Sequence, residues 1–299
     1  MEYYSLNQYL WDTFGEKVYK IALDGGFTCP NRDGKIGVGG CIFCAGDGSG
    51  AFAGSRALSV TEQIENGKAL VEKKMGKATG KPRKYIAYFQ NFTGTYAPVE
   101  RLRELYEKAL APDEIVALSI ATRPDCISEE ILDLLTELNQ RKPVWIELGL
   151  QTIHKDTAEY IRRGYDLSVY ESAVKQLKDR NITVITHMIL GLPGETKEMM
   201  VETARYIGEA GSDGIKLQLL HVLKGTDLAL DYEKGLFEVL PMEEYVQIVV
   251  ECLAVLPERM VIHRLTGDGD KKQLLAPLWS ADKKRVLNRL TKEIREYTR

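Results

Sequence analysis

The sequence predicts an α/β protein built around a parallel sheet, and two patterns carry this prediction. Short apolar runs recur at intervals of about thirty residues, the length of one strand followed by one helix. Each run is nearly continuous in hydrophobicity, as expected for parallel strands covered on both faces. Helix start signals lie between the runs. The predicted strands are 85–90, 115–122, 144–151, 184–191 and 214–222.

Length and composition indicate an ordinary globular chain. It has 299 residues, 44% hydrophobic and 28% charged, with a net charge of −3. No run of eighteen apolar residues exists, so no transmembrane helix is predicted, and residues 1–11 do not resemble a secretory signal. Five cysteines, three of them clustered, argue against a disulfide framework and for a reducing compartment. We therefore expect a cytoplasmic protein with no membrane partner.

The first third of the chain contains a strand, a cysteine-rich loop and a helix. Residues 17–23 are predicted to be a strand that leads directly into the loop. Ser59 and Glu62 have the spacing of a capping box, which predicts a helix to about Met75. The segment 73–84 that follows is strongly basic and interrupted by glycines. It is either a solvated loop or an arm that contacts phosphate.

Four further helices have recognisable start signals. Pro98 occupies a predicted first helical position, and Ser128 and Thr196 are predicted N-caps. Ser168 and Glu171 are predicted to form a second capping box. With the strand at 17–23 the chain contains six strand–helix units, fewer than the eight of a full barrel. Periodicity alone leaves a doubly wound open sheet as an alternative.

The pattern changes after Val222. A helix at 242–256, an apolar run at 260–265 and a basic helix at 283–299 complete the chain. No linker or low-complexity tract separates them from the rest. We expect a core over residues 1–225 and an α/β extension over 226–299 packed on the same domain.

The loop 29–44 is the strongest functional signal. It contains Cys29, Cys41 and Cys44 with the spacing C-x11-C-x2-C, and glycines that allow tight turns. A structural zinc ion normally has four protein ligands, whereas three thiolates on a cubane iron–sulfur cluster leave one iron open. The residues themselves leave open a zinc loop, three reduced thiols or such a cluster. Cys126 and Cys252 are too few for a second cluster.

Polar residues follow several of the predicted strands, at the end where parallel α/β barrels carry their active sites. Thr95 comes after the second strand, Arg123 and Asp125 after the third, and Glu147 lies within the fourth. Glu195 follows the fifth strand in the turn Gly-Leu-Pro-Gly-Glu. Together with the cysteine loop, this pattern favours an active site over a set of unrelated loop residues.

These features resemble the radical S-adenosylmethionine (SAM) enzymes, in the long-loop branch that contains the Elongator catalytic subunit. The segments T-R-P-D-C-I, E-L-G-L-Q-T, R-R-G-Y, L-G-L-P-G-E-T and H-R-L-T-G-D-G resemble the YtqA/YhcC-type family over nearly the whole chain. The resemblance implies a partial (β/α)6 TIM-like barrel. It also implies a [4Fe–4S] cluster on Cys29, Cys41 and Cys44, with SAM on the open iron.

The resemblance further implies SAM contacts at matching positions. Phe43 would lie near the adenine, as would the turn that begins at Gly191, and His187 would contact the ribose. Gln151 and Arg163, twelve residues apart, would serve the ribose and the methionine carboxylate, with Arg162 as an alternative to Arg163. The alternative for Arg163 is a surface ion pair with Glu159, with no role in binding SAM.

One family feature is missing. The Gly-Gly-Glu motif that binds the SAM amino group is absent, so Asn91, Thr93 or Thr95 would have to replace it.

The family is associated with wobble uridine, which suggests tRNA as the partner and an external one-electron donor of the flavodoxin or ferredoxin type. In the YtqA-like branch it suggests removal of the carboxymethyl part of 5-carboxymethylaminomethyluridine, leaving 5-aminomethyluridine. Lys81, Arg83 and Lys84 are the candidate RNA contacts. The alternatives are a radical SAM enzyme acting on a small metabolite or peptide, and a non-catalytic zinc-binding module.

Overall fold

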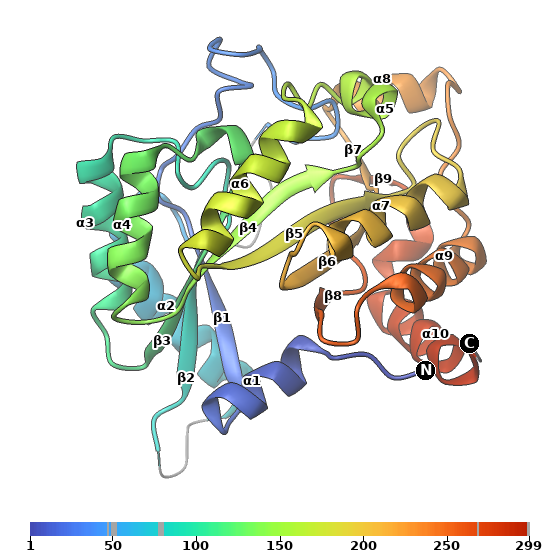
Figure 1. Ribbon diagram of the computed structural model, residues 1–299. Coiled ribbons are helices and arrows are strands. Elements are labelled where there is room, and N and C mark those ends of the chain that lie inside the picture. The colour runs from blue at the N-terminus through green and yellow to red at the C-terminus, as the bar shows by residue number, and fades with distance from the viewer. Residues whose placement is uncertain (47, 49–52, 77–80, 268, 298–299) are drawn as a thin grey trace.

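The computed structural model describes residues 1–46, 48, 53–76, 81–267 and 269–297. Its main sheet has seven parallel strands, and their order in the sheet follows their order in the chain (Figure 1). A doubly wound sheet would reverse its strand order, so this alternative is excluded. The strands are β1 (Val18–Leu23), β2 (Lys84–Phe89), β3 (Ile115–Thr122), β4 (Val144–Gln151), β5 (Thr183–Leu190), β6 (Gly214–Leu219) and β8 (Val261–Arg264).

The sheet is curled into a half-barrel, and side chains that meet across its inner face demonstrate the curl. Lys216 on β6 donates to the hydroxyl of Tyr88 on β2 at 3.1 Å. Four strand spacings of about 4.8 Å separate these strands, so a flat sheet would hold them roughly 19 Å apart. Lys20 on β1 likewise reaches Glu147 on β4 at 2.8 Å. The predicted partial barrel is confirmed.

Helices cover the outer face of the sheet (Figure 1). Their apolar faces join the outward side chains of the strands in one large core. Each crossover between neighbouring parallel strands contains at least one helix, as parallel connections require. The crossover helices are α2 (Val60–Met75), α3 (Val99–Leu110), α4 (Glu129–Asn139), α5 (Lys155–Tyr160), α6 (Leu167–Asp179), α7 (Lys197–Glu209), α8 (Asp227–Glu233) and α9 (Met242–Val255).

The N-terminal helix α1 (Leu6–Phe14) lies at the end of the barrel where the strands begin (Figure 1). Leu10 packs there in a separate apolar cluster with Val18, Ile86 and Trp145. The C-terminal helix α10 (Lys283–Glu296) packs on α9, and the amino group of Met1 donates to its Ile294 carbonyl. The two chain ends therefore lie close together (Figure 1).

Two expectations about the strands need correction. The apolar run at 260–265, which we assigned to the extension, contains β8, which pairs with β6 as the seventh parallel strand of the main sheet. The predicted strand 214–222 ends at Leu219, because the chain then leaves the sheet. Residues Val222–Leu223 form β7, which pairs antiparallel with β9 (Leu274–Ala276).

Helix caps follow the sequence signals with two exceptions, the first of which is Pro98, predicted as the first helical residue but found as the N-cap of α3. Ser59 and Glu62 form the predicted capping box, and Thr196 caps α7 as predicted. The predicted capping box of Ser168 and Glu171 is wrong, because α6 begins at Leu167 with Asp166 as its N-cap. Ser168 lies within the first turn, where its hydroxyl cannot cap.

Candidate active site

The cysteine loop is held in shape by side chains within it. Arg32 donates to the carbonyl oxygens of Cys44 at 2.9 Å and of Gly46 at 3.2 Å. Asn31 donates to the carbonyl of Arg162 at 2.6 Å and lies 3.5 Å from the sulfur of Cys41. A side chain at Gly40 would meet the Arg32 guanidinium at 2.9 Å, and its φ is +87°. The loop thus wraps around Arg32, with glycine required at the closest approach.

All three cysteines of the loop line one cavity at the carboxyl ends of the strands. The cavity has a volume of about 300 Å³. Phe43, Thr93, Gln151, Arg163 and His187 line the same cavity, so most of the predicted cofactor residues gather here from five separate segments. These residues are far apart in the sequence, and the curl of the sheet brings them together.

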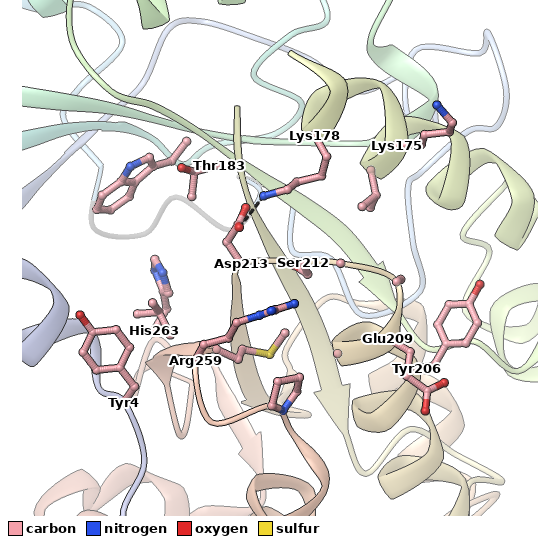
Figure 2. A pocket seen from close by; sticks show the side chains of 18 of the residues that line it. Tyr4, Lys175, Lys178, Thr183, Tyr206, Glu209, Ser212, Asp213, Arg259 and His263 are labelled. Carbon is pink, nitrogen blue, oxygen red and sulfur yellow. Dashed lines mark hydrogen bonds and ion pairs between the residues drawn. The ribbon is translucent and has the colours of Figure 1, made fainter. Parts of the chain in front are cut away.

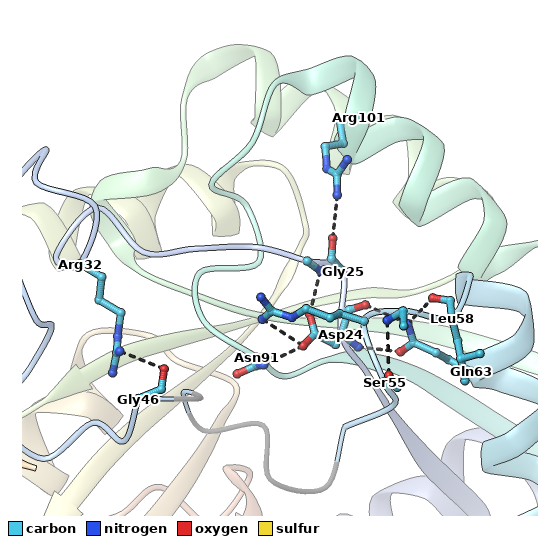
Figure 3. A network of polar contacts seen from close by, with 12 residues as sticks. Asp24, Gly25, Arg32, Gly46, Ser55, Leu58, Gln63, Asn91 and Arg101 are labelled. Carbon is cyan, nitrogen blue, oxygen red and sulfur yellow. Dashed lines mark hydrogen bonds and ion pairs between the residues drawn. The ribbon is translucent and has the colours of Figure 1, made fainter. Parts of the chain in front are cut away.

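Asn91 and Gly191 lie outside the lining of this cavity. Asn91 is buried and donates to Asp24 at the end of β1 at 2.9 Å. Asp24 also accepts from the Gly26 amide and from Arg56, while Gln63 bonds its backbone on the other side (Figure 3). This network fixes the start of the cysteine loop.

The space beside Gly191 is filled. A side chain there would meet Leu240 at 2.9 Å, and the backbone has φ +88°. Glycine therefore has a conformational and packing reason to be at this position.

Gln151 shows the two features expected of a ligand contact. Its φ is +70°, a left-handed conformation that side chains other than glycine rarely adopt. Its Oε1 is buried and has no hydrogen-bond partner among the described residues. A strained backbone conformation costs free energy, and so does a buried acceptor without a hydrogen bond. Both features are common at functional sites. The residues present therefore fit a polar ligand in this cavity.

Arg163 is 3% exposed and uses its guanidinium on backbone carbonyls. It donates to Leu150, to Thr152 at 2.6 Å and to Tyr165 at 3.0 Å. It also lies over the Tyr165 ring at 4.5 Å. These bonds close the loop after β4. Its neighbour differs in each respect, since Arg162 is half-exposed and pairs with Asp227.

A layer of polar side chains inside the barrel lies beneath these residues, where barrels are usually apolar. Its centre is Glu147, fully buried. Oε1 accepts from Lys20 at 2.8 Å and from Ser119 at 2.7 Å. Oε2 accepts from His187 Nε2 at 2.7 Å and from Lys216.

Charge in this layer shifts several pKa values. Burial alone would raise the pKa of Glu147, but Lys20 and Lys216 hold it well below its usual value. Burial lowers the pKa of Lys216 to about 7. Lys20 and Arg264 lower it further, whereas Glu147 raises it. Burial and then Lys216 lower the pKa of His187 to about 4. His187 is therefore neutral near pH 7 and donates through Nε2.

Sequence reasoning missed Lys20, Tyr88, Ser119, Lys216 and Arg264. A signal was present, because Lys216 and Glu147 each stand inside an apolar run. Lysine and glutamate are almost never fully buried unless paired. A lysine in one buried strand and a glutamate in another thus indicate a pair inside the barrel.

The Cys41 thiol is not reactive by itself. Burial and then Cys44 raise the pKa of Cys41 to about 11. A bound metal centre deprotonates a coordinating thiol. Among the described residues, no three His, Cys, Asp or Glu side chains gather around a point that would hold a single metal ion.

A second cavity, of about 890 Å³, lies at the opposite end of the barrel. It is lined by residues where β5, β6 and β8 begin, including Thr183, Asp213 and Val261. Lys178 and Asp213 pair across it (Figure 2). None of the predicted site residues lines it.

The predicted RNA contacts also lie at that opposite end. Lys81 and Arg83 precede β2, and Lys84 is its first residue. Lys84 pairs with Glu16 and donates to the carbonyl of Phe14. The strand β2 spans about 20 Å, so these residues and the cysteines are separated by the height of the barrel. Lys77 and Arg299, further members of the predicted basic segments, lie outside the described residues.

A curled parallel sheet whose first strand leads into a three-cysteine loop is the arrangement of radical SAM enzymes. The model of the Radical SAM superfamily matches residues 29–207, and that of the Radical_SAM C-terminal domain matches residues 212–296. The chain is 48% identical to the uncharacterized protein YtqA of Bacillus subtilis over 292 residues, 98% of this chain and 89% of that protein. It is 40% identical to protein YhcC of Escherichia coli over 89% of this chain and 84% of that protein. The chain belongs to the radical SAM superfamily, in the Elongator-like branch with YtqA and YhcC, and this family indicates an enzyme.

More distant relatives agree with this assignment. A tRNA uridine(34) acetyltransferase of Methanocaldococcus jannaschii is 29% identical over 53% of this chain and 29% of its own length. The solved Elp3 of Methanocaldococcus infernus superposes with a TM-score of 0.64 at 20% identity, over 90% of this chain and 63% of that one. Coproporphyrinogen III oxidase of Escherichia coli gives 0.51 at 15% identity, over 79% and 51%. These likenesses confirm the fold. Within the described residues no helix is both long and apolar enough to cross a membrane.

Proposed function

We propose that this protein is a radical SAM enzyme that acts on wobble uridine of tRNA. In this proposal it removes the carboxymethyl group of 5-carboxymethylaminomethyluridine and leaves 5-aminomethyluridine. The observation that carries the proposal is the single cavity that Cys29, Cys41 and Cys44 share with the polar carboxyl ends of the strands. A ligand in that cavity would touch both the thiols and the barrel interior.

Cys29, Cys41 and Cys44 would hold a [4Fe–4S] cluster that, when bound, supplies the electron for cleavage of SAM. The chain's part is to keep this site closed around its ligands. Arg32 and Asn31 fix the loop, and Asn91 fixes its first residues through Asp24. We propose an external flavodoxin-type or ferredoxin-type donor and a cytoplasmic location.

Phe43, Thr93, Gln151 and His187 are the proposed SAM contacts that line the cavity. Gln151 would accept a hydrogen bond through its orphaned Oε1. Arg163 would act by shaping the loop after β4, since its donors already serve carbonyl oxygens. Gly191 would act indirectly, by shaping the turn after β5, because it lies outside the lining of the cavity.

Charge supports an anionic substrate. Five cationic side chains of the described residues line the cavity against the carboxylates of Glu147 and Asp270. The name of the archaeal relative, tRNA uridine(34) acetyltransferase, supports tRNA as the substrate class. The cationic lining residues are Arg32, Arg123, Arg163, Lys216 and Arg264.

The test is an anaerobic reaction of the cluster-loaded protein with SAM, a chemical reductant and tRNA that carries 5-carboxymethylaminomethyluridine. We expect 5-aminomethyluridine to appear on nucleoside mass spectrometry. The Cys41→Ala protein is the control and should form none. Reductive cleavage of SAM with no change in any tRNA nucleoside would contradict the tRNA substrate and leave a metabolite or peptide.

A further inference from the structure

The C-terminal helix α10 presents a cationic face to solvent. Its apolar side chains Val286, Leu290 and Ile294 are buried, and they pack the helix on α9. The side chains opposite them project within an arc of about 100°, because an α-helix has 3.6 residues per turn. These residues, all exposed, are the outward face of α10: Lys284, Arg285, Asn288, Lys292 and Arg295. The acidic residues of the helix, Glu293 and Glu296, lie outside this arc.

The cations of the outward face have no acidic partner in the part of the chain that the structure describes. Arg289, at the edge of the face, differs because it pairs with Glu243 and Glu293. Lysines on other helices also pair, as Lys175 on α6 does with Asp179. Ion pairs within the protein therefore do not account for the charge of the outward face.

The charge of this face does not serve the stability of the helix either. Like charges three or four residues apart repel one another and destabilise a helix. Lys292 and Arg295 have this spacing, and no acidic residue on the outward face offsets them. A bound polyanion accounts for such a face, because lysine and arginine side chains neutralise phosphates when they bind a nucleic acid.

The helix begins close to the cavity that the three cysteines share. Gln273 lines that cavity, and only β9 and the short 3-10 helix Leu278–Ala281 separate it from α10. Trp279 in this 3-10 helix donates to the carbonyl of Leu240 at 3.0 Å. Leu240 in turn fills the space beside Gly191, which follows β5. The start of α10 is therefore anchored at the end of the barrel that carries the cysteines.

Exposed lysines also border the cavity itself. Lys271 and Lys272 lie between Asp270 and Gln273, which both line it. The exposed Lys224 is held beside them, because its amide donates to the carbonyl of Gln273 at 2.8 Å. Cationic side chains thus occur at the rim of the cavity as well as on the helix that follows it.

We propose that the outward face of α10 docks the sugar–phosphate backbone of the tRNA while the wobble base reaches the cavity. The inference rests on the proposed function, in which the substrate is tRNA, and it adds the surface that holds the RNA. RNA is favoured over an anionic membrane, because an interfacial helix inserts its apolar face into the lipid. The apolar face of α10 is already buried against α9.

The test variant neutralises three cations of the outward face in one chain: Lys284→Gln, Lys292→Gln and Arg295→Gln. The fold should tolerate these changes, since the three side chains are exposed and make no ion pair with the described residues. The matched control neutralises three paired cations away from α10, on α3, after α4 and on α6 (Figure 1): Lys108→Gln, Arg141→Gln and Lys175→Gln. The conservative variant exchanges lysine and arginine at the three positions of the test variant.

The experiment measures the affinity for a tRNA that carries 5-carboxymethylaminomethyluridine over a range of salt concentrations. The cluster-loaded protein is used with SAM present and no reductant. We expect the test variant to bind about tenfold more weakly at roughly 0.1 M salt. Its slope of log affinity against log salt should fall by about two to three, as for three lost phosphate contacts. The matched control and the conservative variant should bind as the wild type does, and reductive cleavage of SAM without tRNA should be unchanged throughout.

The outcomes separate the docking surface from the proposed function. Equal affinity and salt slope in the test variant and the wild type overturn the docking surface, even where wobble uridine is converted. Binding that needs the outward face, with no change in any tRNA nucleoside after reaction, supports the surface and refutes the wobble-uridine chemistry. An equal loss of affinity in the matched control overturns the surface, because the effect then follows net charge alone.

A second ligand tests the alternative polyanion. Vesicles of phosphatidylcholine and phosphatidylglycerol should bind the wild type and the test variant equally. Vesicle binding that needs the outward face, with no binding of tRNA, assigns the face to a membrane surface and overturns the proposal. No binding of tRNA by the wild type at low salt overturns both the docking surface and the proposed substrate.

Discussion

Each of the three loop cysteines contributes one thiol to the wall of the cavity, whereas the two other cysteines do not line it. Cys252 is fully buried in α9, and Cys126 lies beside Asp125. Burial raises the pKa of both thiols, to about 12 for Cys126. Burial raises the pKa of Cys41 as well, so the position of the thiols at the cavity, and not their acidity, separates the two sets.

This difference predicts the effect of single cysteine substitutions. Cys29→Ala, Cys41→Ala or Cys44→Ala should each abolish cluster binding, because a cubane needs all three protein thiolates here. Cys126→Ala and Cys252→Ala should retain it. Iron and sulfide analysis after anaerobic reconstitution measures the effect. A normal iron content in Cys41→Ala would refute the assignment.

We predict that replacing Gln151 lowers SAM affinity without lowering the stability of the fold. Gln151→Gly removes the orphaned Oε1 and relieves the left-handed backbone, since glycine adopts positive φ readily. We expect SAM affinity to fall about tenfold, as for one lost hydrogen bond of roughly 1.5 kcal/mol, while the unfolding temperature stays equal or rises. Equilibrium dialysis with SAM and calorimetry give the two values. Unchanged SAM affinity would remove Gln151 from the site.

Lys216 predicts a pH dependence of stability. Its folded pKa of about 7 lies below the ordinary 10.5, so between these values the unfolded chain holds a proton that the folded chain has released. The free energy of unfolding should rise with pH over this window, by about 1.4 kcal/mol for each unit of pKa difference. The groups that face Lys216 are Glu147, Lys20, His187, Tyr88 and Arg264.

The wild type and Lys216→Met should therefore diverge in unfolding temperature between pH 7 and pH 10, with the wild type gaining the more. Lys216 also shifts the pKa values of Glu147 and His187, but both lie below this pH window, and groups away from Lys216 are common to both proteins and cancel. Parallel profiles would mean that Lys216 is an ordinary charged lysine.

At the scale of elements, the sequence predicted the strands and most helices because their signals are local. The bounds of β3 and β4 agree with the predicted ranges to the residue. The strand β8 was not foreseen as a sheet member, since Val261–Arg264 has four residues and its partner β6 lies far back in the chain. The polar layer depends on the curl of the sheet, which no local pattern contains.

The exposed lysines before β2 allow a test of whether tRNA contacts this end of the barrel. Lys73, Lys74 and Lys81 are exposed, whereas Lys84 is paired to Glu16. If tRNA runs along the barrel to this end, changing the three exposed lysines to Glu should weaken binding and flatten its salt dependence. Reductive SAM cleavage should survive, because the site is at the other end. Unchanged affinity and salt slope would exclude this segment from the RNA contact.

For the whole molecule, the half-barrel separates two ends with different tasks. The carboxyl ends of the strands carry the cysteines, the strained Gln151 and the cationic layer, which together line one cavity. The other end carries α1 and the second cavity, which the Lys178–Asp213 pair lines. None of the predicted site residues lines that second cavity, so we expect the chemistry at the carboxyl ends of the strands.

The proposed action on wobble uridine is tested most directly by nucleoside mass spectrometry of total tRNA from a strain that lacks the protein. We predict that 5-carboxymethylaminomethyluridine accumulates and that 5-aminomethyluridine and its derivatives fall. The wild-type protein should restore them, and Cys41→Ala should not. An unchanged set of wobble uridines in the deletion strain would contradict a role in tRNA modification.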